Sequence, residues 1–186
     1  MKLAFDLHGV VMYLMPVMQE YFKKEVGFEL IETDRFNFPY PDSYDPRRFG
    51  IDIANAIRTL APKIAKPVHG SIPALKRWRA EGNTITFITA SAPSTMDANM
   101  EWLDKWLGGP YQIWRVNSQD GKVKVTKDLG ITHFVDDRFK TCNELAEHLE
   151  QVYLMDAPCN RGRIPKANVT RVRSLRKVFK LTAEYN

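Results

Sequence analysis

The sequence has few cysteines and no long apolar run, and each scarcity excludes a class of protein. Cys142 and Cys159 are the two cysteines among 186 residues, and they form no CxxC pair. This argues against a disulfide framework or a zinc ribbon and favours a reducing compartment such as the cytoplasm. No apolar run approaches the roughly 18 residues that a membrane span requires. Asp6 and His8 interrupt the apolar N-terminal stretch MKLAFDLHGVVMYLM, so we expect a buried strand there and not a signal peptide.

Internal repeats and low-complexity tracts are absent as well. Hydrophobic residues make up 44% of the chain and aromatic residues 11%, which is enough to bury a core. The length predicts one domain, or one domain carrying a large insertion. The formal net charge of +5 favours anionic ligands such as phosphates, nucleotides or nucleic acid.

Short apolar runs alternate with helical patterns along most of the chain. The expected strands cover residues 2–7, 83–89, 132–137 and 151–156, with a weaker one over 111–116. The expected helices cover residues 71–82, 94–109 and 141–151. This order predicts an α/β fold, a Rossmann-like core with a central parallel sheet flanked by helices.

Residues 11–68 break the alternation because they are too long for a simple crossover. They contain two helical patterns, over 16–27 and 51–64, and a loop rich in proline and aromatic residues over 35–50. Long insertions of this kind are usually lids or binding loops. We therefore expect a small helical cap over 11–68, inserted after the first strand of a core domain that consists of residues 1–10 and 69–186.

Polar side chains lie at the carboxyl ends of three of the expected strands. They are Asp6 and His8 at the end of 2–7, Thr89 and Ser91 at the end of 83–89, and Asp136 and Asp137 at the end of 132–137. Open α/β sheets bind their ligands outside the carboxyl ends of the strands. Three distant stretches therefore deliver acids and hydroxyls to one crevice.

This group of residues is suited to chemistry on phosphate. Three carboxylates repel one another unless a cation lies among them, and oxygen ligands select a hard ion such as Mg²⁺. One carboxylate can then attack phosphorus, while hydroxyls hold the phosphoryl oxygens and a lysine neutralises the remaining charge. Lys122, Lys124 and Lys127 precede the acidic pair, and Lys127 is the nearest to it in sequence.

Each residue alone also has a purely structural explanation. Aspartates at strand ends often cap helices or form turns. Thr89 and Ser91 can cap the helix expected to begin near Ser94. The pair Asp136 and Asp137 is harder to explain in this way, because two neighbouring acids at a buried strand end require a counter-charge. Taken together, the residues favour catalysis.

The stretches FDLHGV, FITAS and FVDDR, together with Lys127, resemble the four motifs of the haloacid dehalogenase superfamily of phosphohydrolases. A closer resemblance is to the 5′(3′)-deoxyribonucleotidase family. It is carried by VHGSIPALKRWRAEGNTITFITAS, EWLDKWLG and YLMDAPCNRG. The resemblance covers residues 1–10 and 68–175, and it extends to the cap only in size and helical character.

This resemblance implies a role for each site residue. Asp6 is the implied phosphoryl-accepting nucleophile and a Mg²⁺ ligand, and Asp137, helped by Asp136, completes the metal site. In the family's phosphatases, the residue two positions after the nucleophile is normally an aspartate. Its backbone carbonyl binds the metal, and its side chain protonates the leaving oxygen and then activates water. Here that residue is His8.

For binding of the phosphate, the resemblance implies Thr89 together with Ser91. Lys127 is the implied lysine that bridges phosphate and nucleophile, and Lys124 is the alternative.

Three hypotheses follow for His8. In the first, His8 is a working general acid and base, since an imidazole with an ordinary pKa near ~6.5 suits proton transfer at neutral pH. Alternatively it is a poor substitute that leaves a slow enzyme, or the site has lost catalysis and binds phospho-ligands. We favour the first, because every other motif residue is intact. A purely structural alternative is that His8 packs under the cap.

The cap loop suggests the substrate. It offers aromatic rings and arginines, which suit the base and phosphate of a (deoxy)nucleoside monophosphate. These residues are Phe36, Phe38, Tyr40, Tyr44 and Phe49, with Arg47 and Arg48. The competing explanation is that most of the rings form the core of the cap itself.

A second class of function is removal of a terminal phosphate from DNA or RNA. The basic segment near the C-terminus motivates it, with Arg171, Arg173, Arg176, Lys177 and Lys180. The simpler explanation is the solvated face of a helix. Asn160 and Arg161 also lie near the expected crevice, and we assign them no chemistry beyond tying loops together.

Overall fold

The structure is a computed structural model, and it describes residues 1–31, 40–118 and 121–183. Its centre is a six-stranded sheet in the order β5-β4-β1-β6-β7-β8, in which every neighbouring pair is parallel. The strands are β1 (Leu3–Phe5), β4 (Thr86–Thr89), β5 (Gln112–Arg115), β6 (His133–Asp136), β7 (Gln151–Met155) and β8 (Val169–Val172). The predicted parallel α/β sheet is therefore confirmed.

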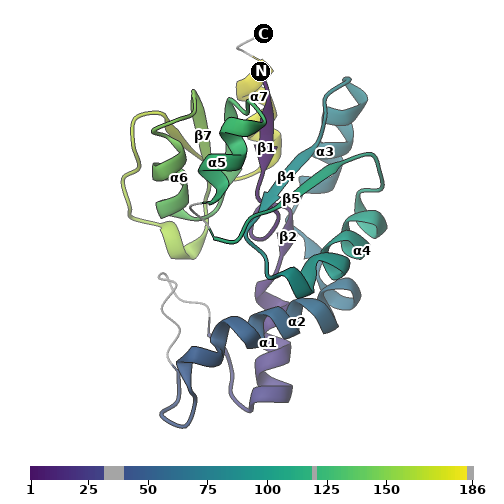
Figure 1. The fold of residues 1–186 in the computed structure, drawn as a ribbon, viewed down its shortest axis with the longest axis vertical. Helices are drawn as coiled ribbons and strands as arrows, with labels where there is room; N and C mark the ends of the chain where they lie inside the picture. Colours follow the sequence, from purple (N-terminus) through teal and green to yellow (C-terminus); the bar gives the residue numbers. More distant parts are fainter. Residues whose placement is uncertain (32–39, 119–120, 184–186) are drawn as a thin grey trace.

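Helices cover both faces of this sheet, with α5 and α6 on one side and α3 and α4 on the other (Figure 1). Their bounds are α3 (Ser71–Ala80), α4 (Met96–Trp106), α5 (Gly121–Asp128), α6 (Phe139–Leu145) and α7 (Leu175–Ala183). No helix among the described residues is long and apolar enough to cross a membrane.

Alternation of side chains along the strands divides the core in two. In β1, Leu3 and Phe5 belong to the apolar cluster that includes residues of α3, α4 and α7, whereas Ala4 belongs to the cluster that includes residues of α6. In β6, Val135 and Phe134 divide in the same way. Successive side chains of a strand point to opposite faces, so a sheet buried on both faces needs continuous apolar runs.

Between β1 and α3 the chain forms a separate group of helices at the carboxyl end of the sheet (Figure 1). Its elements are β2 (Met12–Tyr13), α1 (Met15–Tyr21), the π-helix η1 (Phe22–Val26), the 3₁₀ turn η2 (Pro46–Arg48), α2 (Phe49–Ile64) and β3 (Lys66–Pro67). Met18, Phe22, Leu30 and Tyr44 form a small core of its own. β2 and β3 pair antiparallel at its base.

Hydrogen bonds fix this helical group to the sheet domain. Trp102 of α4 donates from Nε1 to the carbonyl of Ala65 at 2.9 Å, and Lys105 donates from Nζ to the carbonyl of Pro62 at 3.0 Å. The Trp102 side chain is fully buried. α2 is thereby held against α4, which places the helical group firmly over one end of the sheet.

Several elements were not expected from the sequence, among them α5, β8 and the short strands β2 and β3. Residues 121–128 form α5, although the alternating KVKV stretch there is typical of a strand or a loop. β8 was not predicted either, because VTRV has two polar residues out of four. The first of these differences changes the site, as described below.

Candidate active site

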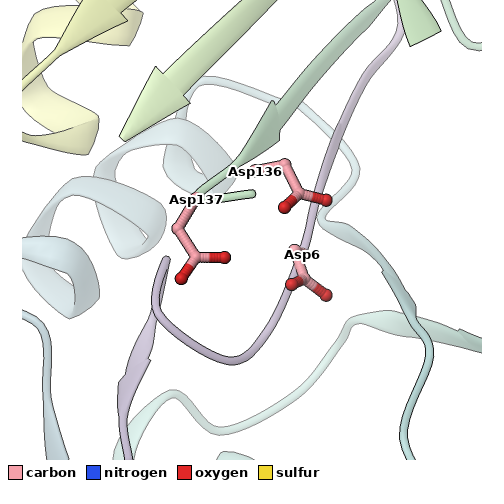
Figure 2. A group of neighbouring side chains, drawn as sticks. All are labelled: Asp6, Asp136 and Asp137. Carbon is pink, nitrogen blue, oxygen red and sulfur yellow. The ribbon is translucent and has the colours of Figure 1, made fainter. Parts of the chain in front are cut away.

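Three aspartates converge where β1 and β6 end (Figure 2). Asp6 directly follows β1, Asp136 is the last residue of β6, and Asp137 comes next. Phe5 pairs with Val135, so the residues that follow them lie beside each other. One carboxylate oxygen from each aspartate lies within 4.8 Å of the others. The convergence of Asp6, Asp136 and Asp137 that the sequence suggested is therefore present.

A glycine makes this approach possible. Gly9 has a φ of +77°, a conformation that favours glycine, and a Cβ atom placed on it would lie 2.1 Å from Oδ2 of Asp137. The turn is closed by two backbone hydrogen bonds, from Gly9 to the carbonyl of Met12 and from Met12 to the carbonyl of Leu7, each 2.9 Å long. The FDLHGV stretch therefore turns back on itself, and its backbone at Gly9 lies directly against the Asp137 carboxylate that follows β6.

The lysine that contacts these carboxylates is Lys122. Its Nζ lies 3.1 Å from Oδ1 of Asp6 and 2.7 Å from Oδ2 of Asp136, and the side chain has no exposed surface. Lys127 is exposed on the outside of α5. The placement predicted for Lys127 is thus corrected, and Lys124, the alternative, is exposed and pairs with Asp128.

The physical reason for this correction is the helical period of α5. With 3.6 residues per turn, Lys122 and Thr126 share one face, and both are buried. Lys124 and Lys127 are turned away from the direction of Lys122 by roughly 160° and 140°. Nearness in sequence to the acidic pair was therefore the wrong criterion, and burial on one helix face was the right one.

The positive charge of Lys122 does not fully neutralise the three carboxylates of the cluster. Burial, followed by the nearby charges of Asp136 and Asp6, holds the pKa of Asp137 well above its ordinary value. Burial and the charge of Asp6 also raise the pKa of Asp136, against the opposing effect of Lys122. Burial alone would lower the pKa of Lys122, but Asp136 and Asp6 outweigh it and raise that pKa, so the lysine stays charged.

These observations fit a divalent cation at the cluster. Three carboxylates share a single lysine in direct contact with two of them, and the remaining negative charge raises the pKa of both members of the acidic pair. Oxygen donors at such spacing suit a hard ion such as Mg²⁺. The residues present therefore match the metal that the sequence predicted.

His8 lies in a network of side chains that sequence reasoning did not find. Its Nε2 lies 3.1 Å from Oδ1 of Asn99, a fully buried residue of α4. Asn99 also donates from Nδ2 to Oγ of Ser91 at 3.2 Å, and Ser91 lies 2.8 Å from Oγ1 of Thr89. The ring's other nitrogen, Nδ1, lies 3.5 Å from Oγ of Ser91. Thr89, Ser91 and His8 thus lie in one crevice, as predicted, and Asn99 links them.

This network fixes the state of the His8 ring. An amide oxygen accepts but does not donate, so Nε2 carries the hydrogen and Nδ1 is left as the basic nitrogen. Burial lowers the pKa of His8 to about 4, while the hydrogen bond to Asn99 opposes that shift and the charge of Lys122 adds to it. The ring is accordingly neutral near pH 7 in this structure.

The capping explanation for Thr89 and Ser91 is not supported. The 3₁₀ turn η3 (Pro93–Thr95) and α4 begin after Ala92 and Thr95, and neither start has a side-chain cap. The hydroxyls of Thr89 and Ser91 instead bond to each other beside His8. Both hydroxyl-bearing residues are buried at the floor of a cavity.

That cavity has a volume of about 940 Å³ and is lined by the site residues described above except three fully buried ones, Asn99, Lys122 and Asp136. Its floor includes Asp6, His8, Thr89, Ser91 and Asp137. The volume is in the range of clefts that enclose small organic molecules. A substrate much larger than inorganic phosphate therefore fits above the carboxylates.

The described aromatic rings of the loop over residues 35–50 do not line this cavity. Tyr40, Tyr44 and Phe49 pack against one another and against Phe22. The Tyr44 hydroxyl donates to Oδ2 of Asp52 at 2.8 Å. These rings form the core of the helical group, as the competing explanation held.

The two arginines of that loop are paired locally, Arg47 with Asp45 and Arg48 with Asp52. Phe36 and Phe38, which the sequence also suggested, lie outside the described residues.

The basic segment divides between structure and site. Arg171 donates from Nη2 to the carbonyls of Asn160 and Arg163, at 2.9 and 3.0 Å. Arg173 lines the cavity.

Asn160 donates from Nδ2 to the carbonyls of Asp137 and Met155, at 2.8 and 2.7 Å, so the expectation that it ties loops together is confirmed. Arg161 lines the cavity and lies 3.7 Å from Asp156.

Comparison with known proteins bears on the fold. No protein-family model and no curated protein matches the chain. Among solved structures, it is similar to a haloacid dehalogenase (HAD) hydrolase of family IA, variant 3, from Entamoeba histolytica, at 15% identity and a TM-score of 0.64, covering 95% of this chain and 94% of that one. A HAD-family hydrolase from Deinococcus radiodurans with bound phosphate and sodium gives 16% and 0.62, covering 98% and 95%.

A third similar structure is a putative β-phosphoglucomutase from Thermotoga maritima, at 13% identity and a TM-score of 0.63, with both chains covered completely. At such low identity, these similarities establish the fold and not the activity. The chain has the fold of HAD hydrolases over its whole length, with its acidic cluster at the carboxyl end of the sheet.

Proposed function

We propose that the protein is a Mg²⁺-dependent phosphatase of the HAD type, which hydrolyses a phosphate monoester through an aspartyl-phosphate on Asp6. The observation that supports this most is the cluster of Asp6, Asp136 and Asp137 around the buried Lys122. A (deoxy)nucleoside monophosphate is the proposed substrate, following the resemblance of the sequence to 5′(3′)-deoxyribonucleotidases. The phosphate bound to the Deinococcus radiodurans hydrolase agrees with a phosphoryl ligand in this fold.

The residues divide the work as follows. A carboxylate oxygen of Asp6 attacks phosphorus, and the bond from phosphorus to the ester oxygen breaks. Thr89 and Ser91 hold phosphoryl oxygens, and Lys122 stabilises the negative charge that spreads over the transferred group. Asp6, Asp136, Asp137 and the backbone carbonyl of His8 would hold Mg²⁺, which would supply positive charge to the nucleophile and the phosphoryl group.

Proton transfer is assigned to His8. Asn99 occupies Nε2, so Nδ1 is the nitrogen that exchanges a proton with the leaving oxygen. The dianionic substrate supplies the negative charge that favours the protonated ring. Once the leaving group has gone, Nδ1 takes a proton from the water that hydrolyses the phosphorylated Asp6.

The helical group over residues 11–68 serves in this proposal as the cap that selects the substrate. The core domain of residues 1–10 and 69–186 carries out the reaction. A reducing compartment such as the cytoplasm is part of the proposal, since a chain whose two cysteines are Cys142 and Cys159 has little scope for a disulfide framework.

A second candidate is a phosphatase acting on the end of a nucleic acid. Arg161 and Arg173 at the cavity favour it, since both offer positive charge beside the carboxylates. Polymer binding weakens steeply with salt because each neutralised phosphate releases counterions. An activity on oligonucleotide ends that falls by orders of magnitude between low and moderate salt favours this candidate, and a flat salt response favours the nucleotide.

The decisive experiment measures phosphate release from a panel of nucleotides, sugar phosphates and acetyl phosphate, with and without Mg²⁺. Wild type is compared with Asp6→Asn. We expect Mg²⁺-dependent turnover that the substitution abolishes. Binding of phosphate esters without turnover instead identifies a phospho-ligand binding protein, which is the third hypothesis for this site.

A further inference from the structure

The side of the cavity opposite the carboxylates has no hydrogen-bonding side chain among the residues that α1 and α2 contribute to it. The lining residues from these helices and the residue before α1 are Leu14, Met15, Met18, Gly50, Ile53, Ala54 and Ile57. Val68, after β3, continues this surface, and Tyr13 of β2 also lines the cavity. We call Leu14, Met15, Met18, Ile53 and Ile57 the apolar wall.

The apolar wall is formed before any ligand arrives. Met18 and Ile57 are buried in two different apolar clusters, and Ile53 packs against both. The bonds from Trp102 and Lys105 hold α2 against α4. A rigid apolar surface is therefore presented to the same cavity whose floor holds Asp6, Thr89 and Ser91.

The wall and the floor together restrict the leaving group. Once the phosphoryl group is at Asp6, the rest of the ester occupies the same cavity and contacts the wall. A hydroxyl-rich leaving group would lose water there without gaining a partner from the wall, and unpaired polar groups are selected against strongly. An apolar or aromatic ring has no polar groups to desolvate there, and by covering the wall it removes apolar surface from contact with water.

We infer that the substrate is a phosphate monoester whose leaving group presents an apolar or aromatic face to the wall, and that this face is selected by shape with little polar recognition. The inference rests on the proposed function, because the phosphoryl group defines where the leaving group lies. It predicts strong preference for ring-bearing esters over polyol phosphates. It also predicts weak discrimination among nucleobases that face the wall, since a wall without polar contacts rejects isosteres poorly.

The test compares kcat/KM for acetyl phosphate, 1-naphthyl phosphate and sorbitol 6-phosphate, together with four nucleoside 5′-monophosphates. We expect 1-naphthyl phosphate to exceed sorbitol 6-phosphate by roughly 100-fold or more, and the four nucleotides to agree within roughly 10-fold. A polyol phosphate that turns over as fast as the naphthyl ester overturns the inference. A nucleotide preferred by several orders of magnitude over the other three overturns its shape-selection part.

A matched pair of variants locates the effect. Met15→Gln keeps the length of the side chain and adds an amide to the wall, whereas Met100→Gln makes the same change at an exposed residue of α4 outside the cavity. We expect Met15→Gln to raise KM for 1-naphthyl phosphate by roughly 10-fold and to leave acetyl phosphate unchanged. Met100→Gln should change neither. Equal losses for both substrates in Met15→Gln contradict the role of the wall.

Binding separates failure of this inference from failure of the proposed function. Calorimetry with 1-naphthylmethylphosphonate and methylphosphonate needs no turnover, and we expect the first to bind wild type at least roughly 10-fold tighter. Absence of turnover on every ester, with that preference intact, refutes the phosphatase and retains the wall. Turnover of acetyl phosphate without the preference refutes the wall alone.

Discussion

The floor and the wall of the cavity are built by opposite means. At the floor, Asp6 is held by its contact with the buried Lys122 and by the strand register that places Asp136 beside it, and like charges are brought together at a cost in stability. The wall rests on apolar packing, around Phe22 for example. The comparison suggests that the sheet fixes the reaction while the helices decide which ester reaches it, so changes on the two sides should have separable effects.

The largest expected effect is on the charged side, from Lys122→Met. Loss of the cation leaves Asp6 and Asp136 facing each other and removes charge stabilisation from the transferred group, so we expect kcat to fall by roughly 100- to 1,000-fold. Lys127→Met is the matched control and should keep wild-type kcat, because Lys127 is exposed. Steady-state kinetics with thermal melting would check this. The reverse result, with Lys127→Met inactive, would restore the original assignment.

The next effect concerns proton transfer. His8→Ala should lower kcat by roughly 100-fold, the usual contribution of a general acid or base, while His8→Asp should retain or raise turnover. The substitutions leave the wall intact, so KM for 1-naphthyl phosphate should change little. If His8→Ala and wild type turn over at the same rate, His8 has no role in proton transfer.

A smaller loss is expected for the residue that orients the ring. Asn99→Leu preserves volume but removes the acceptor for Nε2, so we expect kcat to fall by roughly 10-fold with little change in KM. Nitrogen NMR of labelled His8 should show a hydrogen on Nε2 in wild type and a mixture of tautomers in the variant. A hydrogen on Nδ1 in wild type would mean that the amide of Asn99 is turned around.

The smallest effect is on stability. Burial, Asp136 and Asp6 hold the pKa of Asp137 well above that of an unfolded aspartate. The metal-free folded chain therefore binds more protons than the unfolded chain, and its stability should fall as pH rises above about 4.

Mg²⁺ should raise the melting temperature near pH 7 by a few degrees. Asp137→Asn should raise it without Mg²⁺ and remove the gain from the ion. No response of wild type to Mg²⁺ would contradict the metal site.

The sequence predicted the floor of the cavity well because the parallel sheet does most of the positioning. Apolar runs identified β1, β4 and β6, and the carboxyl ends of adjacent parallel strands meet at one edge. Asp6, Thr89 and Asp136 follow from that rule without any knowledge of side-chain contacts. The separate helical group was also anticipated, since an insertion too long for a crossover needs helices or strands of its own.

Residues positioned by helices were the ones that sequence reasoning missed. The KVKV alternation concealed α5, and with it the buried face that carries Lys122. Asn99 lies in α4, 91 residues from His8, and nothing local marks it as a partner. The apolar wall looks like ordinary helix core in the sequence. The aromatic loop attracted attention instead, although its described rings pack inward.

The short antiparallel pair of β2 and β3 has a consequence for the evolution of such a protein. Met12 lies opposite Pro67, so the chain departs for the helical group and returns from it at the same place. A segment with adjoining ends can be lengthened, shortened or replaced without redirecting the strands that flank it. On the proposed function, recombination of the stretch from Leu14 to Ala65 can therefore change which ester is preferred. Chimaeras joined at the β2–β3 pair should keep the reacting groups of the sheet domain in place.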